Sequence, residues 1–143
     1  MQPNLHDADR LSWLEQQVHL LQTGRLEALD IEHLTEELEA EMGNERRELY
    51  RRLRILIGHL LKWHYQSEQR SASWAGPIRV QRKDILKLLK GSPSLKRFIE
   101  EEICEAHQDA VDLASFETGI DTAAFPADCP YSVDDLLNAD YWP

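Results

Sequence analysis

One apolar stripe restricts the fold of this chain more than any other feature. Between residues 31 and 63, apolar side chains recur every three or four positions, which is typical of one face of an amphipathic helix. Asp30 can cap the start of this helix, and only Gly43-Asn44 weakens the pattern. The stripe consists of Ile31, Leu34, Leu38, Met42, Leu49, Leu53, Leu56, Leu60 and Trp63. The pattern therefore predicts one unusually long helix.

The length of this helix bears on the oligomeric state. A helix from Ile31 to about Tyr65 would be roughly 50 Å long, since each residue adds 1.5 Å. A compact domain of this size has a radius of gyration of about 14–15 Å. The helix must therefore bend at Gly43-Asn44, extend past its neighbours, or pack against a second copy. We expect a bend or an overhang, together with a homodimer that buries the stripe.

A shorter helix is expected on each side of the long one. The earlier helix can be capped by Asp7 and can end at Gly24. The later helix begins near Ser73 or Pro77 and stops at Gly91. Their apolar stripes are Leu11, Leu14, Val18 and Leu21 in the first helix, and Trp74, Ile78, Ile85 and Leu88 or Leu89 in the third. Strand alternation is almost absent, so the predicted fold class is all-α.

The last part of the chain adds two more helices and a tail. Ser92-Pro93 provides a cap and a first-turn proline for a fourth helix, which ends at Gly119. Ser132 with Asp135 resembles a capping box that opens a short fifth helix. Two aromatic side chains in Tyr141-Trp142-Pro143 favour packing of this tail onto the helices. The prediction is an up-and-down four-helix bundle with a long second helix, a short fifth helix and an aromatic C-terminal tail.

Charge is sorted along the chain into three blocks. Residues 1–45 contain two basic and eleven acidic side chains, residues 46–97 contain fourteen and three, and residues 98–143 contain none and twelve. The net charge of −10 argues against general attraction to nucleic acid or to anionic membranes. The basic block can pair with the acidic helices around it, or it can meet a phosphate backbone or an acidic partner.

Segments that would direct the chain to a membrane or across it are not evident. The first ten residues lack the pattern of a secretory signal. The longest apolar run, Ile55 to Leu61, is far shorter than the roughly 20 residues of a membrane-spanning helix. The two cysteines, Cys104 and Cys129, form no disulfide framework. We expect a single helical domain over residues 1–143, cytoplasmic, with both thiols reduced.

Several short segments follow one another along the chain in a distinctive order. They are LLQTGRLEALD at Leu20 to Asp30, HLLKWHYQ at His59 to Gln66, RSASW at Arg70 to Trp74, FPADCPYS at Phe125 to Ser132, and the terminal YWP. This series resembles the bacterial family catalogued as domain-of-unknown-function family number 29, and the resemblance covers nearly the whole chain. The resemblance implies a helical fold and no established biochemical activity, and it supplies no catalytic residues.

The segment between residues 59 and 82 has the most unusual composition, because aromatic and basic side chains alternate there. His59 and Gln81 lie on or beside apolar stripes, so they need hydrogen-bond partners if they are buried. One interpretation is a structural polar network that fixes the turn between the second and third helices. The other is an anion pocket at the N-terminus of the third helix. The residues of this candidate anion or polar pocket are His59, Trp63, Arg70, Trp74, Arg79, Gln81 and Arg82.

Metal-ligating pairs are present but sparse. No Glu-x-x-His pair of the kind found in di-iron bundles occurs. His33 with Glu36 or Glu37, and Cys104 with His107, can each share a helix face and could contribute to a zinc site. A small thiol near an apolar stripe is more often simple core filler. We therefore predict no metal site and no cofactor.

Three functions remain after this survey. The leading one is a non-enzymatic interaction or regulatory helical module that acts as a homodimer. A second is a divalent-metal-dependent hydrolase, for which Glu101, Glu102 and Glu105 have suitable spacing, although solvated helix faces explain them better. A third is a phosphate or nucleic-acid binder that uses the basic block 46–97. A nucleophile elbow and a glycine-rich phosphate loop are both missing from the sequence.

Overall fold

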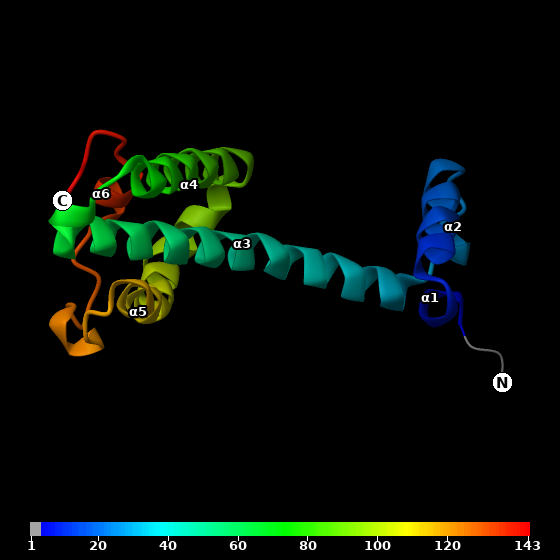
Figure 1. The fold of residues 1–143 in the computed structure, drawn as a ribbon. Coiled ribbons are helices and arrows are strands. Elements are labelled where there is room, and N and C mark those ends of the chain that lie inside the picture. The colour runs from blue at the N-terminus through cyan, green and yellow to red at the C-terminus, as the bar shows by residue number, and fades with distance from the viewer. Residues whose placement is uncertain (1–3) are drawn as a thin grey trace. The chain divides into compact units, whose positions relative to one another are not determined.

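The computed structural model describes residues 4–143, and its regular elements in this range are all helical (Figure 1). The predicted all-α class is confirmed. Contacts within the chain divide it into two compact units, Met1–Gly43 and Asn44–Pro143. We call them the N-terminal unit and the C-terminal unit. They meet within helix α3, Ile31–Tyr65, which continues through Gly43-Asn44 as a single helical element.

The N-terminal unit begins with two short elements. Helix α1 covers Leu5–Ala8 and helix α2 covers Arg10–Gln22. The prediction that Asp7 caps the first long helix was wrong, because Asp9 accepts the Ser12 amide at 3.1 Å. Asp9 is the last residue before the helical dihedrals begin, and Asp7 belongs to α1.

A turn follows α2 and leads into α3. Gly24 ends the helix as predicted, with the positive φ of 71° that glycine adopts without steric cost. A short 3₁₀ helix, η1, covers Leu26–Ala28. Helix α3 then begins directly after Asp30, whose carboxylate accepts the His33 amide at 3.3 Å. The long second helix therefore has the start that the sequence predicted.

The buried face of α2 differs from the one that the leucines indicate. Trp13, Gln17 and Leu20 are buried, whereas Leu11, Val18 and Leu21 are exposed. The Trp13 indole donates to Asp30 Oδ2 at 2.9 Å, and Gln17 Oε1 accepts the Asp30 amide at 2.8 Å. These two hydrogen bonds join the buried face of α2 to the start of α3. The prediction of a buried leucine stripe in α2 was therefore wrong.

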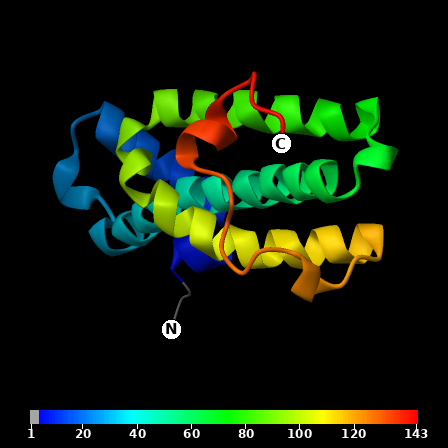
Figure 2. The same cartoon turned by 90° about the vertical axis from the view of Figure 1, so that its left-hand side faces the viewer.

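The C-terminal unit contains the second half of α3 and the remaining helices. Their bounds are α4, Ala72–Gly91; η2, Ser67–Gln69; η3, Pro93–Phe98; α5, Ile99–Thr118; η4, Thr122–Ala124; and α6, Val133–Leu137. Figure 2 shows the second half of α3 between α4 and α5, and α6 packs on α4. Leu49, Leu53, Leu56 and Leu60 of the predicted stripe are fully buried in this core.

Local signals fix most helix ends in this unit. Ser132 and Asp135 form the predicted capping box of α6. Gly119 ends α5 in the left-handed conformation, with φ of 76°. Ser92-Pro93 opens the 3₁₀ helix η3, and α5 itself begins only at Ile99. Gly58 lies against Leu113, whose Cδ2 would be 3.3 Å from an added Cβ, so a glycine here permits close approach of α3 and α5.

Candidate functional site

The residues of the candidate anion or polar pocket do not form one cluster. All of them lie in the C-terminal unit. Four surround the terminal segment of the chain, and these are Trp63, Arg70, Arg79 and Arg82. The other three, His59, Trp74 and Gln81, have partners elsewhere.

Arg82 is the centre of the first group. Its side chain is buried within the unit, and its Nε donates to the Leu136 carbonyl at 2.8 Å. Its Nη2 donates to the carbonyls of Asp135 and Tyr141, at 3.0 and 2.7 Å. Burial lowers the pKa of this guanidinium from its ordinary value. Arg82 therefore binds carbonyl oxygens at the end of α6 and in the tail.

The terminal Trp142 lies among the other members of this group. Its ring centroid is 4.7 Å from that of Trp63, and the Arg79 guanidinium carbon is 5.7 Å from the Trp142 ring centroid. Arg70 Nε donates to the Trp63 carbonyl at 2.8 Å, and Arg70 Nη2 donates to the Pro143 carbonyl at 3.1 Å. The basic side chains predicted to bind anions thus contact an aromatic pair and backbone carbonyls of the chain itself.

A second group surrounds the buried Lys62. Its ammonium pairs with Glu117 and lies 5.2 Å from the centroid of the Trp74 ring. His59 donates from Nδ1 to the Ile55 carbonyl at 2.9 Å, one turn earlier in the same helix. Burial lowers the pKa of the His59 imidazole. Lys62, which the sequence did not single out, is the ionic centre of this group.

Gln81 belongs to a third group. Its Oε1 accepts from Arg52 Nη1 at 3.4 Å, and the same Arg52 nitrogen donates to Asp84 at 3.0 Å. Arg52 also pairs with Glu48 one turn earlier in α3. His59 and Gln81 therefore have different partners on α3, Ile55 and Arg52.

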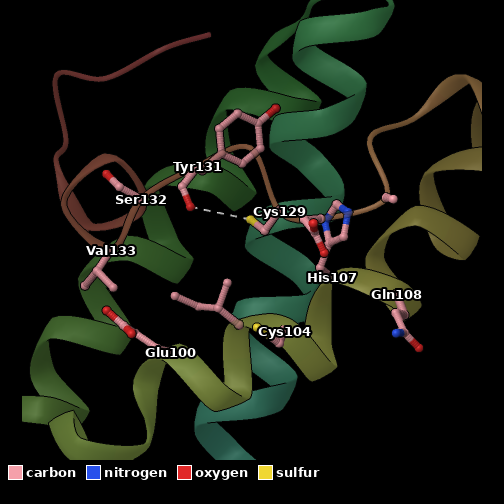
Figure 3. Close-up of a pocket in the computed structure, with 11 residues that line it drawn as sticks. Glu100, Cys104, His107, Gln108, Cys129, Tyr131, Ser132 and Val133 are labelled. Carbon is pink, nitrogen blue, oxygen red and sulfur yellow. Dashed lines mark hydrogen bonds between the residues drawn. The ribbon is translucent and has the colours of Figure 1, made fainter.

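A pocket of about 390 Å³ lies between α5 and the segment that precedes α6 (Figure 3). Cys104, His107, Cys129 and Tyr131 are among its lining residues. His107 Nε2 donates to the Pro126 carbonyl at 2.8 Å, while its buried Nδ1 has no partner among residues 4–143. The Cys129 thiol donates to the Tyr131 carbonyl at 3.6 Å, and burial raises the pKa of this thiol. The two thiols are not joined in a disulfide.

Sequence spacing had paired Cys104 with His107, and the structure adds Cys129 to the same pocket. Cys129 lies in an irregular segment, so no periodic pattern could place it beside α5. The aromatic Tyr131 is buried as well, and burial raises the pKa of its hydroxyl. This pocket can hold a small molecule beside the two thiols.

A separate polar cluster lies in the N-terminal unit. Glu37 accepts from Arg10 through Nε at 2.9 Å and Nη2 at 2.6 Å, and from His6 Nε2 at 2.9 Å. Arg10, and after it His6, holds the pKa of Glu37 down to about 2. His33 donates from Nδ1 to Asp30 Oδ2 at 2.7 Å. His33, which spacing places on one helix face with Glu36 or Glu37, therefore pairs with Asp30, and Glu37 pairs with Arg10 and His6.

These observations define a two-unit helical protein with polar clusters in both units. The model of the family described as "Domain of unknown function DUF29" matches residues 5–142, and the chain belongs to this family. Comparison with curated proteins and with solved structures gave no significant match. Between residues 4 and 143, none of the helices combines the length and the apolar composition needed to cross a membrane.

Proposed function

We propose that this chain is a non-enzymatic interaction or regulatory module that acts as a homodimer through its N-terminal unit. The observation that carries the proposal is the number of large apolar side chains that this unit leaves exposed. They are Leu5, Leu11, Val18, Leu21, Leu26, Ile31, Leu38 and Met42. Leu38 is 65 % exposed and Met42 is 75 % exposed. Apolar surface of this extent is typical of interaction sites.

The N-terminal unit has a small interior of its own. Trp13, Gln17 and Leu20 are its buried side chains in the described range. Units of roughly 40 residues usually need a disulfide, a metal ion or oligomerisation to be stable. Full burial of one leucine, isoleucine, valine or methionine side chain contributes about 1.5–3 kcal/mol. A partner that covers these side chains therefore adds the core that the unit lacks.

Charge favours a second copy of this chain as the partner, in one particular arrangement. Helix α2 carries one basic and one acidic side chain, Arg10 and Glu15, whereas residues 31–43 carry five acidic side chains and no basic one. Packing two α3 segments against each other would bring their carboxylates close together, and these would repel. Packing α2 of each copy on α3 of the other avoids this repulsion and repeats twice around a two-fold axis. Two helices from each copy then surround one apolar core, which is the packing of a four-helix bundle.

The two rival functions have weaker support. Two of the carboxylates considered for a hydrolase, Glu101 and Glu102, accept from Arg46 at 2.9 and 2.5 Å. Among the basic side chains considered for phosphate binding, Arg70 and Arg82 bind backbone carbonyls. These four side chains therefore have internal partners. The two unpaired thiols favour a reducing compartment, and we infer a cytoplasmic location.

Light scattering tests the dimer. At micromolar concentration we expect a mass of about twice 16.6 kDa for the wild-type chain. The double variant Leu38→Gln, Met42→Gln removes two of the most exposed apolar side chains, so it should be monomeric. Phe116→Gln is the matched control, because Phe116 is 89 % exposed but lies on α5. A monomeric wild type, or a double variant that stays dimeric, contradicts the proposal.

A further inference from the structure

The polar cluster of the N-terminal unit brings three potential metal ligands together. His6, Asp7 and His33 each present one ligand atom, and these atoms lie within 4.8 Å of one another. The rings of His6 and His33 stack, with 4.2 Å between their centroids. His6 and Asp7 belong to α1, and His33 belongs to the first turn of α3. The three side chains therefore join two elements that are far apart in the sequence.

Outer carboxylates orient both imidazole rings. His33 donates from Nδ1 to Asp30 Oδ2 at 2.7 Å, which leaves its Nε2 with a lone pair. Asp30 Oδ2 is itself held by the Trp13 indole at 2.9 Å. His6 donates from Nε2 to Glu37 at 2.9 Å, and Arg10 holds that carboxylate. A ligating histidine almost always donates its other ring N–H to such a group, so this is the outer arrangement of a metal site.

The electrostatics of the cluster favour a cation. His6 contacts Glu37 Oε1 through Nε2 at 2.9 Å and Asp7 Oδ1 through Nδ1 at 3.2 Å, so both of its ring nitrogens face carboxylates. This arrangement attracts positive charge, which either a second proton on the imidazole or a metal ion bound to Nδ1 can supply. Asp7, Asp30 and Glu37 contribute three negative charges and Arg10 one positive charge, a formal balance of −2 when both imidazoles are neutral. A divalent cation would neutralise this balance.

We propose that His6, Asp7 and His33 bind a divalent transition metal ion of the zinc type, with Asp30 and Glu37 as outer-shell carboxylates. Two imidazole nitrogens and one carboxylate oxygen make three protein ligands, so a fourth, tetrahedral position stays open for water. Ligand atoms around tetrahedral zinc lie about 3.3 Å apart. Asp7 Oδ1 and His6 Nδ1 already lie 3.2 Å apart, so metal binding requires a shift of the His33 nitrogen toward them. Imidazole nitrogen favours such ions over Mg²⁺ and Ca²⁺, which prefer oxygen.

Calorimetric titration with Zn²⁺, using the full chain without an affinity tag, tests the site. The chain contains two cysteines that could also bind zinc, so the titration is repeated on the variant Cys104→Ser, Cys129→Ser. We expect one zinc ion per chain in this thiol-free parent. Co²⁺ gives a second readout, because it should develop the intense visible absorption of a tetrahedral complex. Failure of the thiol-free parent to bind either ion overturns the proposal.

Variants in the thiol-free parent identify the ligands. Asp7→Asn and His33→Gln should each weaken zinc binding at least about tenfold, and Glu37→Gln should weaken it about 10–100-fold through the outer shell. Asp7→Asn is the more decisive variant, because its exposed carboxylate can be changed without opening the unit. His19→Gln, an exposed histidine on α2, is the matched control and should bind like the parent. Parental affinity in Asp7→Asn or His33→Gln overturns the site.

Discussion

The same apolar stripe is buried in one unit of this protein and exposed in the other. The stripe on α3 runs through both, and in the C-terminal unit Leu53 and Leu56 are completely buried by the surrounding helices. In the N-terminal unit Leu38 and Met42 continue the stripe and remain exposed. Hydrophobic periodicity therefore identifies a helix and one of its faces, but it does not say what covers that face.

The units also differ in what holds their elements together. Hydrogen bonds to Asp30 join α2 to α3 in the N-terminal unit, through the side chains of Trp13 and Gln17. In the C-terminal unit the helices pack around an apolar core, and Arg82 adds a hydrogen bond to the tail. One unit therefore depends mainly on directional contacts, and the other depends mainly on burial.

The largest expected contrast is between two leucines on the same stripe. Leu53→Ala removes a fully buried side chain and should lower the free energy of unfolding by about 2–5 kcal/mol. Leu38→Ala changes an exposed side chain and should cost less than about 0.5 kcal/mol in the monomer. Urea denaturation at a concentration low enough to dissociate a dimer measures both. Equal losses would show that the stripe is buried over its whole length in a single chain.

A smaller effect is expected for the arginines around the tail. Arg82→Ala leaves the Leu136 and Tyr141 carbonyls without their buried donor and should cost about 2–3 kcal/mol. The matched variant Arg70→Ala removes an exposed guanidinium and should cost about 1 kcal/mol or less. Urea denaturation followed by tryptophan fluorescence reports both. A loss for Arg82→Ala no greater than that for Arg70→Ala would contradict the structural role given to Arg82.

The smallest effect concerns the indole that joins α2 to α3. Trp13→Phe removes one hydrogen bond to Asp30 and part of the buried ring. The free energy of local opening of α2 should therefore fall by about 1 kcal/mol. Hydrogen exchange of the α2 amides should therefore accelerate several-fold. Trp74→Phe, in the C-terminal unit, is the control and should leave α2 exchange unchanged. Faster exchange throughout α5 in Trp13→Phe would show that the two units open as one.

Local signals made most helix ends predictable from the sequence. Asp30, Gly24, Gly119 and the Ser132–Asp135 box act on their immediate neighbours, so a short window of sequence contains the information. The buried face of α2 was not predictable in this way. It depends on Asp30, which is distant in the sequence from Trp13 and Gln17, and the leucine count favours the wrong face.

The candidate sites were harder to predict for the same reason. Arg82 was identified as unusual, but its partners Asp135 and Tyr141 come from the other end of the chain. Helical spacing placed His33 on one face with Glu36 or Glu37, whereas its hydrogen bond is to Asp30 in the preceding turn. His6 was not considered, because a histidine in the first ten residues has no periodic neighbour. Long-range pairing of polar side chains leaves little trace in a single sequence.

Hydrogen exchange at two protein concentrations tests the central claim most directly, namely that a second copy covers the apolar face of the N-terminal unit. Above the dimer dissociation constant, amides of α2 and of residues 31–43 should exchange more slowly than they do well below it. Amides of residues 49–61, whose side chains are largely buried within one chain, should exchange at the same rate at both concentrations. Identical exchange of α2 and residues 31–43 at both concentrations, with the mass of a monomer throughout, would contradict the account.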